Sequence, residues 1–219
     1  MGYLESNAET EVMMKRVMSV ILTLAAVGAA AGAIAAPQVY TIEPMHTYPS
    51  FKASHMGVSF WRGKFDHSSG KIVLDRERGT GRIDVAIDPS SVDFGLDALN
   101  QVAKGPQLFE VAKYPTAKYQ SDSITFKEGV PVSANGRLTL HGVTRPVPLT
   151  IRSFKCIVNP FFKREVCGAD VTARFDRTKF GMTQYAEDPW VYLYIQVEAV
   201  KGTSVPAEAP PPAAPAPAG

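Results

Sequence analysis

The sequence lacks an excess of charge of either sign and has few of the residues that metal and nucleophile sites use. Its 219 residues contain 23 Lys and Arg against 21 Asp and Glu, four His and two Cys. A near-neutral balance gives no electrostatic indication of nucleic-acid binding, which is usually accompanied by a basic domain or stripe. No His lies at metal-ligand spacing from another His, Cys or Glu, and nucleophile elbows, Walker loops and dinucleotide fingerprints are missing. A Ser-His-Asp triad stays open, since only a fold assembles one. We therefore assign no catalytic or metal-binding residue and expect no cofactor.

The N-terminal segment has the pattern of an export signal. Basic Lys15-Arg16 precedes an apolar, Ala-rich run from Val17 to Ala36, which contains the small-x-small sequence Ala33-Ile34-Ala35. This order predicts a signal peptide over residues 1–35 and a periplasmic or secreted protein. The alternative is a membrane anchor, because about 20 apolar residues can span a bilayer. Residues 2–12 are polar and acidic, which is unusual before the basic region of a signal peptide. Met13 or Met14 is therefore the alternative start of translation.

The C-terminal segment is nearly all Ala and Pro. Residues 204–219 hold six of the 17 prolines, and such a composition favours an extended, disordered tail. A single folded domain is expected between the two segments, over residues 37–201.

The two cysteines flank a turn signal, Asn159-Pro160. A hairpin centred between Phe161 and Phe162 places Cys156 opposite Cys167, which predicts a disulfide in an oxidising compartment. Two free thiols or a metal-binding pair are the alternatives. Strict alternation puts the two side chains on different faces, so either a β-bulge shifts the phase or the register differs.

The rest of the chain has the two-residue alternation of half-buried strands. An antiparallel all-β domain is predicted, with strands at Val39–Glu43, Phe51–His55, Gly63–Phe65, Lys71–Asp75, Arg82–Asp88, Ala117–Phe126, Asn135–His141, Val147–Val158, Ala169–Phe175 and Val191–Val200. Only Asp97–Ala112 has a helical pattern, and Gly105-Pro106 divides it into two short helical pieces. Alternation alone leaves a sandwich and a closed barrel equally open.

Several segments resemble the YceI-like, polyisoprenoid-binding family over Val39 to Val200. They are Tyr40-Thr41-Ile42-Glu43-x-x-His46, Phe51-x-x-x-His55-x-Gly57-Val58, Gly70-x-Ile72-x-x-Asp75, Ser91-Val92-Asp93, Leu108-Phe109-Glu110-x-x-Lys113-Tyr114-Pro115, Gly136–Val147 and Asp176-Arg177-x-x-Phe180-Gly181-Met182. The resemblance implies an eight-stranded antiparallel, lipocalin-like barrel with a short helical insertion and an apolar tunnel. It also implies non-covalent binding of an isoprenoid or other long-chain lipid and no catalysis. The expected partners are that lipid, a membrane touched transiently and a second copy of the chain, but not nucleic acid.

Alternation and resemblance together nominate residues that face the tunnel. The candidates are Phe51, Ala53, His55, Ile83, Val85, Ile87, Asp93, Leu99, Phe109, Leu138, Leu140, Val171, Phe175, Leu193 and Ile195. His55 and Asp93 are the polar candidates near a lipid head group; the plainer readings are a core histidine and a turn or cap residue. Residues 99–103 are uncharged where the family pattern has charge, which disfavours a diphosphate head relative to a neutral quinone, amide or alcohol.

Two alternatives to a lipid carrier remain open from the sequence. One is an enzyme that acts on a lipid in the same cavity. The other is a stress-response partner module without a transport role.

Overall fold

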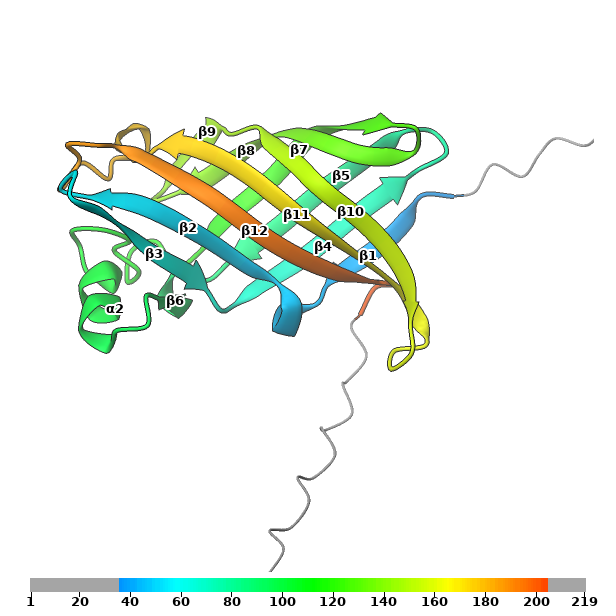
Figure 1. The fold of residues 1–219 in the computed structure, drawn as a ribbon, viewed down its shortest axis with the longest axis horizontal. Coiled ribbons are helices and arrows are strands. Elements are labelled where there is room, and N and C mark those ends of the chain that lie inside the picture. Colours follow the sequence, from blue (N-terminus) through cyan, green and yellow to red (C-terminus); the bar gives the residue numbers. More distant parts are fainter. Residues whose placement is uncertain (1–35, 205–219) are drawn as a thin grey trace, which may run out of the picture. The chain divides into compact units, whose positions relative to one another are not determined.

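The computed structural model describes residues 36–204, which form antiparallel strands and one short α-helix (Figure 1). The predicted signal peptide and all but Ser204 of the predicted tail lie outside the described residues. The strands are β1 (Gln38–Ile42), β2 (Tyr48–His55), β3 (Ser59–Phe65), β4 (Ser68–Asp75), β5 (Thr80–Ile87), β6 (Val92–Asp93), β7 (Ala117–Lys127), β8 (Val130–Leu140), β9 (Val143–Pro146), β10 (Leu149–Asn159), β11 (Arg164–Asp176) and β12 (Trp190–Lys201). In this part of the chain, no helix is long and apolar enough to cross a membrane.

Eight of these strands close into a barrel. Their order is β1-β4-β5-β7-β8-β10-β11-β12, and β1 pairs with β12 to complete the ring, with Tyr40 opposite Lys201 and Ile42 opposite Ala199. The all-β prediction is thus confirmed, and the domain is a closed barrel and not a sandwich. Closure removes the free sheet edges that an open sheet would expose.

A second group of strands extends the wall at one end. The first half of β12 pairs with β2, placing Val191 opposite Ala53, and β2 continues to β3 and β6. Pro49 pairs with Ile195 on one side, while the β2–β3 register begins only at Ser50. A residue without an N–H is tolerated there because β3 offers it no partner.

The helical insertion is shorter than predicted. Helix α2 spans Asp97–Lys104, but the second expected piece, after Gly105-Pro106, forms successive turns. Gly105 is extended, and Glu110 has a φ of 44°, which a right-handed helix does not admit. Short 3₁₀ helices lie at η1 (Pro44–His46), η2 (Pro89–Ser91) and η3 (Arg177–Phe180).

The predicted disulfide is confirmed. Cys156 and Cys167 are paired across β10 and β11, and their sulfurs are 2.03 Å apart. The register shifts between Ile151 and Ser153, so a bulge changes which residues of β10 face inward. Leu149 and Ile151 precede the bulge and Phe154 follows it, yet all three line the interior. This bulge removes the conflict of phase that strict alternation produced.

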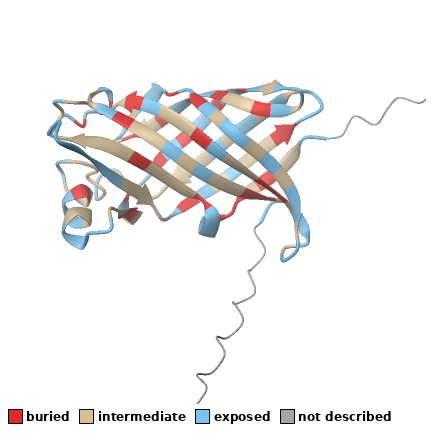
Figure 2. Cartoon of the chain, in the orientation of Figure 1, coloured by how far each residue is buried: buried red, intermediate tan, exposed pale blue. Residues whose placement is uncertain are grey.

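Many inward-facing side chains of the barrel are only half buried (Figure 2). Ile83, Val85 and Leu193 face inward on their strands but are intermediate in exposure, whereas Tyr40 and Ile42 are 2% exposed. A close-packed interior would bury all of them alike. Side chains therefore do not fill the interior of the barrel completely.

Candidate functional site

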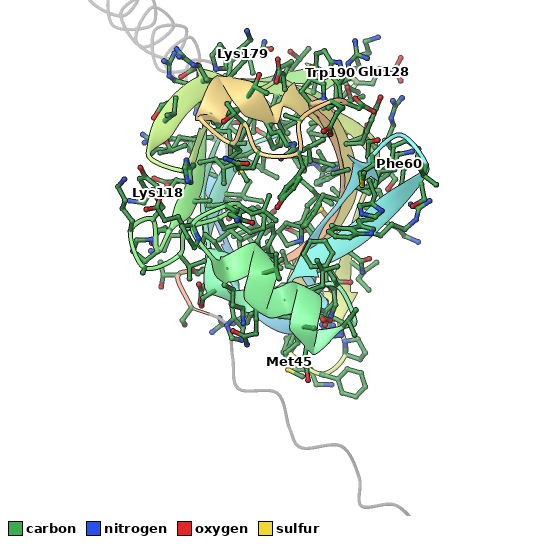
Figure 3. All side chains as sticks on the ribbon, turned by 90° about the vertical axis from the view of Figure 1, so that its left-hand side faces the viewer. Met45, Phe60, Lys118, Glu128, Lys179 and Trp190 are labelled. Atoms are coloured by element: carbon green, nitrogen blue, oxygen red, sulfur yellow. A yellow bond between two sulfur atoms is a disulfide. The ribbon has the colours of Figure 1, made fainter. Side chains whose placement is uncertain are left out.

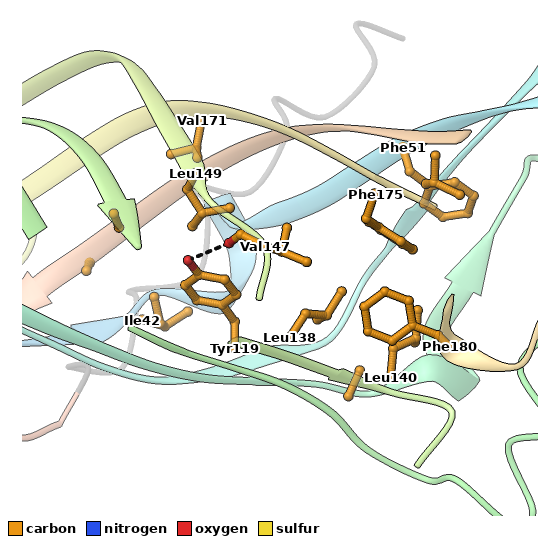
Figure 4. Close-up of a cluster of buried hydrophobic side chains, with 14 of the residues drawn as sticks. Ile42, Phe51, Tyr119, Leu138, Leu140, Val147, Leu149, Val171, Phe175 and Phe180 are labelled. Atoms are coloured by element: carbon orange, nitrogen blue, oxygen red, sulfur yellow. Dashed lines mark hydrogen bonds between the residues drawn. The ribbon is translucent and has the colours of Figure 1, made fainter. Parts of the chain in front are cut away.

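The hollow is an apolar cavity of about 430 Å³ inside the barrel. Most of its wall comes from alternate residues of the strands, because successive side chains of a strand point to opposite faces. The volume lies within the range of roughly 300–1,000 Å³ that is typical of small-molecule sites. Figure 4 shows how Leu138 of β8 and Val171 and Phe175 of β11 converge on the interior.

A smaller pocket of about 70 Å³ continues the cavity toward the disulfide. Both pockets share wall residues, namely Ile72, Ile83, Leu149, Val171 and Val197. The smaller one ends among Tyr40, Phe154 and Cys167. The two spaces therefore follow one another along the barrel, as an elongated ligand requires.

Thirteen of the fifteen nominated residues lie in the cavity wall. They are Phe51, Ala53, His55, Ile83, Val85, Ile87, Phe109, Leu138, Leu140, Val171, Phe175, Leu193 and Ile195. Alternation thus located the wall, although whether these side chains contact a ligand stays a prediction.

Leu99 and Asp93 are not among the residues that line this cavity, and a ligand contact by either stays a prediction. On α2 the wall residue is Val102, so the uncharged stretch 99–103 contributes only this side chain to the cavity. The Asp93 carboxylate accepts hydrogen bonds from the Gly95 N–H (2.8 Å) and the Asn100 amide (3.2 Å). These bonds, with help from nearby Lys64, hold the pKa of Asp93 below its usual range. Asp93 is therefore the turn residue of the plainer reading, since it fixes the start of α2.

Aromatic side chains line one end of the cavity. The Phe51 ring lies 5.5 Å from those of Phe65 and Phe94 and 6.3 Å from that of Phe109. These rings come from β2, β3 and the segments on both sides of α2, so they join the helical insertion to the barrel. The sequence nominated only two of the four.

The same end contains the mouth of the cavity. Met56, Val102 and Tyr185 line the cavity and are also 69%, 51% and 59% exposed. Viewed toward this end, α2 crosses the lower part of the ring of strands (Figure 3). The interior is therefore continuous with the surface between the β2–β3 hairpin, α2 and the segment after η3.

Few polar groups interrupt the wall, and most are already bonded. The Tyr119 hydroxyl donates to the Val147 carbonyl at 3.0 Å (Figure 4), and burial raises the pKa of this phenol. The His55 ring stacks on Trp61 with centroids 4.2 Å apart. Stacking beside the mouth suits either reading of His55, as a core histidine or as a contact for a head group.

Arg177 is the one charged side chain among the wall residues described. It is 7% exposed and its Nη2 donates to the Tyr185 carbonyl, while its Nε has no partner within residues 36–204. Burial lowers the pKa of Arg177, and the carboxylates of Glu187, Asp176 and Asp188 oppose this shift. Sequence alternation missed Arg177, Met182 and Tyr185 because they lie on η3 and the loop after it, where no two-residue period operates. Tyr119, by contrast, alternates with Ala117 and could have been found.

Across residues 36–204, no three His, Cys, Asp or Glu side chains gather to hold a metal ion.

Comparison with known proteins agrees with this architecture. The model of the YceI-like domain matches residues 40–200. The chain belongs to the YceI-like family. This YceI-like chain is 28% identical to a UPF0312 protein of Vibrio parahaemolyticus over 171 residues, 78% of this chain and 90% of the relative. It is 33% identical to the protein YceI of Salmonella arizonae over 118 residues, 53% of this chain and 61% of that protein.

Solved structures share the fold of this YceI-like chain. BcnA of Burkholderia cenocepacia superposes with a TM-score of 0.58 at 22% identity, covering 72% of this chain and 99% of BcnA. A polyisoprenoid binding domain from Saccharophagus degradans, implicated in plant cell wall breakdown, gives a TM-score of 0.53 at 17% identity, covering 74% and 98%.

Proposed function

We propose that this protein is a periplasmic carrier that holds an isoprenoid or another long-chain lipid inside the barrel, without catalysis and without a further cofactor. The observation that carries the proposal is the elongated apolar cavity of about 430 Å³, open at one end. Membership of the YceI-like family supports it, as does the fold shared with a polyisoprenoid binding domain.

The energetics of such a complex are favourable. At about 0.3 kcal/mol per non-hydrogen atom, a chain of about 40 carbons gains roughly 12 kcal/mol, which corresponds to nanomolar affinity. A lipid of this length is almost insoluble in water, so an enclosing protein lets it cross an aqueous space. A neutral quinone, amide or alcohol head is proposed, because the cavity wall is almost entirely apolar and its Tyr119 hydroxyl and Arg177 Nη2 already donate to backbone carbonyls.

Two features of the chain support the periplasmic part of the proposal. The basic and apolar pattern of residues 13–36 is that of a secretory signal, and the Cys156–Cys167 disulfide is typical of an oxidising compartment. Cell fractionation, with N-terminal sequencing of the exported form, tests both. A protein retained in the cytoplasm with its first 35 residues would overturn this part.

The decisive experiment is mass spectrometry of an organic extract from the protein, purified from its own periplasm without detergent. A stoichiometric isoprenoid quinone or polyprenyl species is expected. A shorter fatty acid or amide would change the ligand class, and an empty, folded protein that takes up no lipid would favour the partner-module alternative.

Two charge insertions test the cavity directly. Val85 and Leu193 line it from β5 and β12, so Val85→Glu or Leu193→Glu places a carboxylate against the bound chain. Each variant is expected to keep its β-sheet circular dichroism and lose stoichiometric lipid. The matched control is Asn135→Glu, which adds the same charge at an exposed position of β8. Equal lipid content in all variants would refute the assignment of the cavity.

A further inference from the structure

One side of the barrel's outer surface carries basic and aromatic side chains without a carboxylate among them. It consists of four neighbouring strand segments, 172–174 of β11, 190–196 of β12, 48–54 of β2 and 60–64 of β3, none of which contains Asp or Glu. Residues that alternate with the cavity wall point outward here. We call these outward residues the basic aromatic flank; they are Tyr48, Lys52, Phe60, Arg62, Lys64, Arg174, Trp190, Tyr192 and Tyr194.

Cations and rings of the flank are in contact. The Lys52 ammonium lies 4.7 Å from the centre of the Phe60 ring and 5.0 Å from that of Tyr192. The Arg174 guanidinium lies 4.9 Å from the ring centre of Trp190. Such contacts hold the charges beside the rings while both remain accessible, since Phe60 is 48% exposed and Trp190 38%.

Carboxylates leave most of this charge uncompensated. Lys64 pairs with Asp66 at 2.6 Å and Asp93 at 3.9 Å. Within the described residues, Lys52, Arg62 and Arg174 form no ion pair. Three positive charges on neighbouring strands therefore face solvent, and an anionic surface complements them.

The flank leads directly to the mouth of the cavity. At the tip of the β2–β3 hairpin, Met56 and Val58 are 69% and 86% exposed, and Met56 also lines the cavity. Apolar side chains at this position lie between the charged flank and the hollow interior.

We propose that the basic aromatic flank and the hairpin tip dock the protein onto a bilayer that contains anionic lipids. Aromatic side chains favour the membrane–water interface, and each Lys or Arg near an anionic bilayer contributes about 1 kcal/mol. Docking on this side brings the mouth to the membrane, so a lipid can enter or leave without crossing water. The inference rests on the proposed lipid-carrier function and names the surface it uses. The exposed apolar tip beside the mouth favours a bilayer over a nucleic acid, which would use the charges and rings alone.

Vesicle co-sedimentation at low salt tests the docking surface. The protein as purified from its host, with its C-terminal segment retained, is mixed with phosphatidylcholine vesicles that contain or lack phosphatidylglycerol, and no vesicle contains an isoprenoid. The double variant K52E/R62E is expected to bind phosphatidylglycerol vesicles at least about 30-fold more weakly, since two basic contacts of about 1 kcal/mol each are lost. Val58→Asp, at the exposed tip, is expected to weaken binding as well.

The control is K118E/R137E, which makes the same change of charge at exposed positions of β7 and β8. Lys118 and Phe60 lie on opposite sides of the ring of strands in Figure 3. This control is expected to bind as the parent does. The proposal is overturned if both double variants bind the vesicles equally well, or if phosphatidylglycerol does not strengthen vesicle binding by the parent protein. It is equally overturned if the flank binds an oligonucleotide instead of vesicles, or if K52E/R62E dissociates a dimer in analytical ultracentrifugation without affecting vesicle binding.

Lipid extraction from the same proteins separates this proposal from the proposed function. K52E/R62E leaves the cavity wall intact and is expected to take up detergent-dispersed lipid normally. A parent that docks but carries no lipid would refute the carrier function alone, and a loaded parent that never docks would refute only the flank.

Discussion

Phe51 is the central ring of the aromatic cluster at the mouth, and its removal gives a measurable test of how the insertion is held. The ring is 8% exposed and lies within 6.3 Å of three other Phe rings, centre to centre. Truncation of a buried Phe to Ala costs about 3–5 kcal/mol. For a domain of this size, each kcal/mol lowers Tm by about 2–4 °C, so Phe51→Ala is expected to lower Tm by about 6–20 °C.

Gly63 makes the same packing testable by a double-mutant cycle. A Cβ added at Gly63 would lie 2.8 Å from Cζ of Phe51 and 3.0 Å from Cε1 of Phe94. Gly63→Ala therefore overpacks the cluster, at a cost of about 1–3 kcal/mol. With Phe51→Ala in place the closest obstacle is gone, so the second substitution is expected to cost less.

Urea unfolding of the parent, both single variants and the double variant measures this coupling. The double variant should be more stable than the sum of the single effects by about 1 kcal/mol or more. Additivity within about 0.5 kcal/mol, or a fall in Tm of less than about 2 °C for Phe51→Ala, would refute this account of the mouth.

Three further variants probe other parts of the barrel. Replacing Cys156 and Cys167 by Ser opens a loop with a sequence separation of 11 residues, and about 3 kcal/mol of unfolding free energy should be lost in chemical denaturation. Tyr119→Phe leaves the buried Val147 carbonyl without its donor and should cost about 1–3 kcal/mol by the same assay. The pKa of Asp93 is depressed in the folded state, so its contribution is present above pH of about 4 and is lost as the pH falls through the folded pKa. Asp93→Asn should therefore reduce the fall in Tm between neutral and acid pH. An equal fall in Tm in the parent and the variant would contradict this role.

The sequence predicts the strands well where one face is apolar and the other polar. On β5 and β12, Ile83, Val85 and Leu193 follow this alternation, and all line the cavity. The period fails at β10, where one extra residue near Ile151 reverses the phase, and a bulge leaves no mark in a hydrophobic pattern. It also misses β6 and β9, because strands of two and four residues are too short to show a period.

The mouth is the part of the site that sequence periodicity could not locate. Leu99 and Val102 have similar places in a helical pattern, yet only Val102 reaches the cavity. Asp93 directly precedes Phe94, which lines the cavity, but the Asp93 carboxylate accepts hydrogen bonds from Gly95 and Asn100 within the turn. Arg177 and Tyr185 belong to a loop whose path depends on tertiary contacts. Tertiary packing therefore decides which helix and loop residues line the cavity, and the two-residue alternation of strands does not predict it.

The two pairings of β12 have a mechanical consequence. Its C-terminal half closes the eight-stranded ring through β1, while its N-terminal half holds β2 and, beyond it, β3. Among the strand pairings of β12, separation from β2 would break those of Tyr48–Ala53 with Val191–Gln196, and it would leave the pairings of the eight-stranded ring in place. Closure of the hollow around its circumference therefore does not depend on the strands beside the mouth.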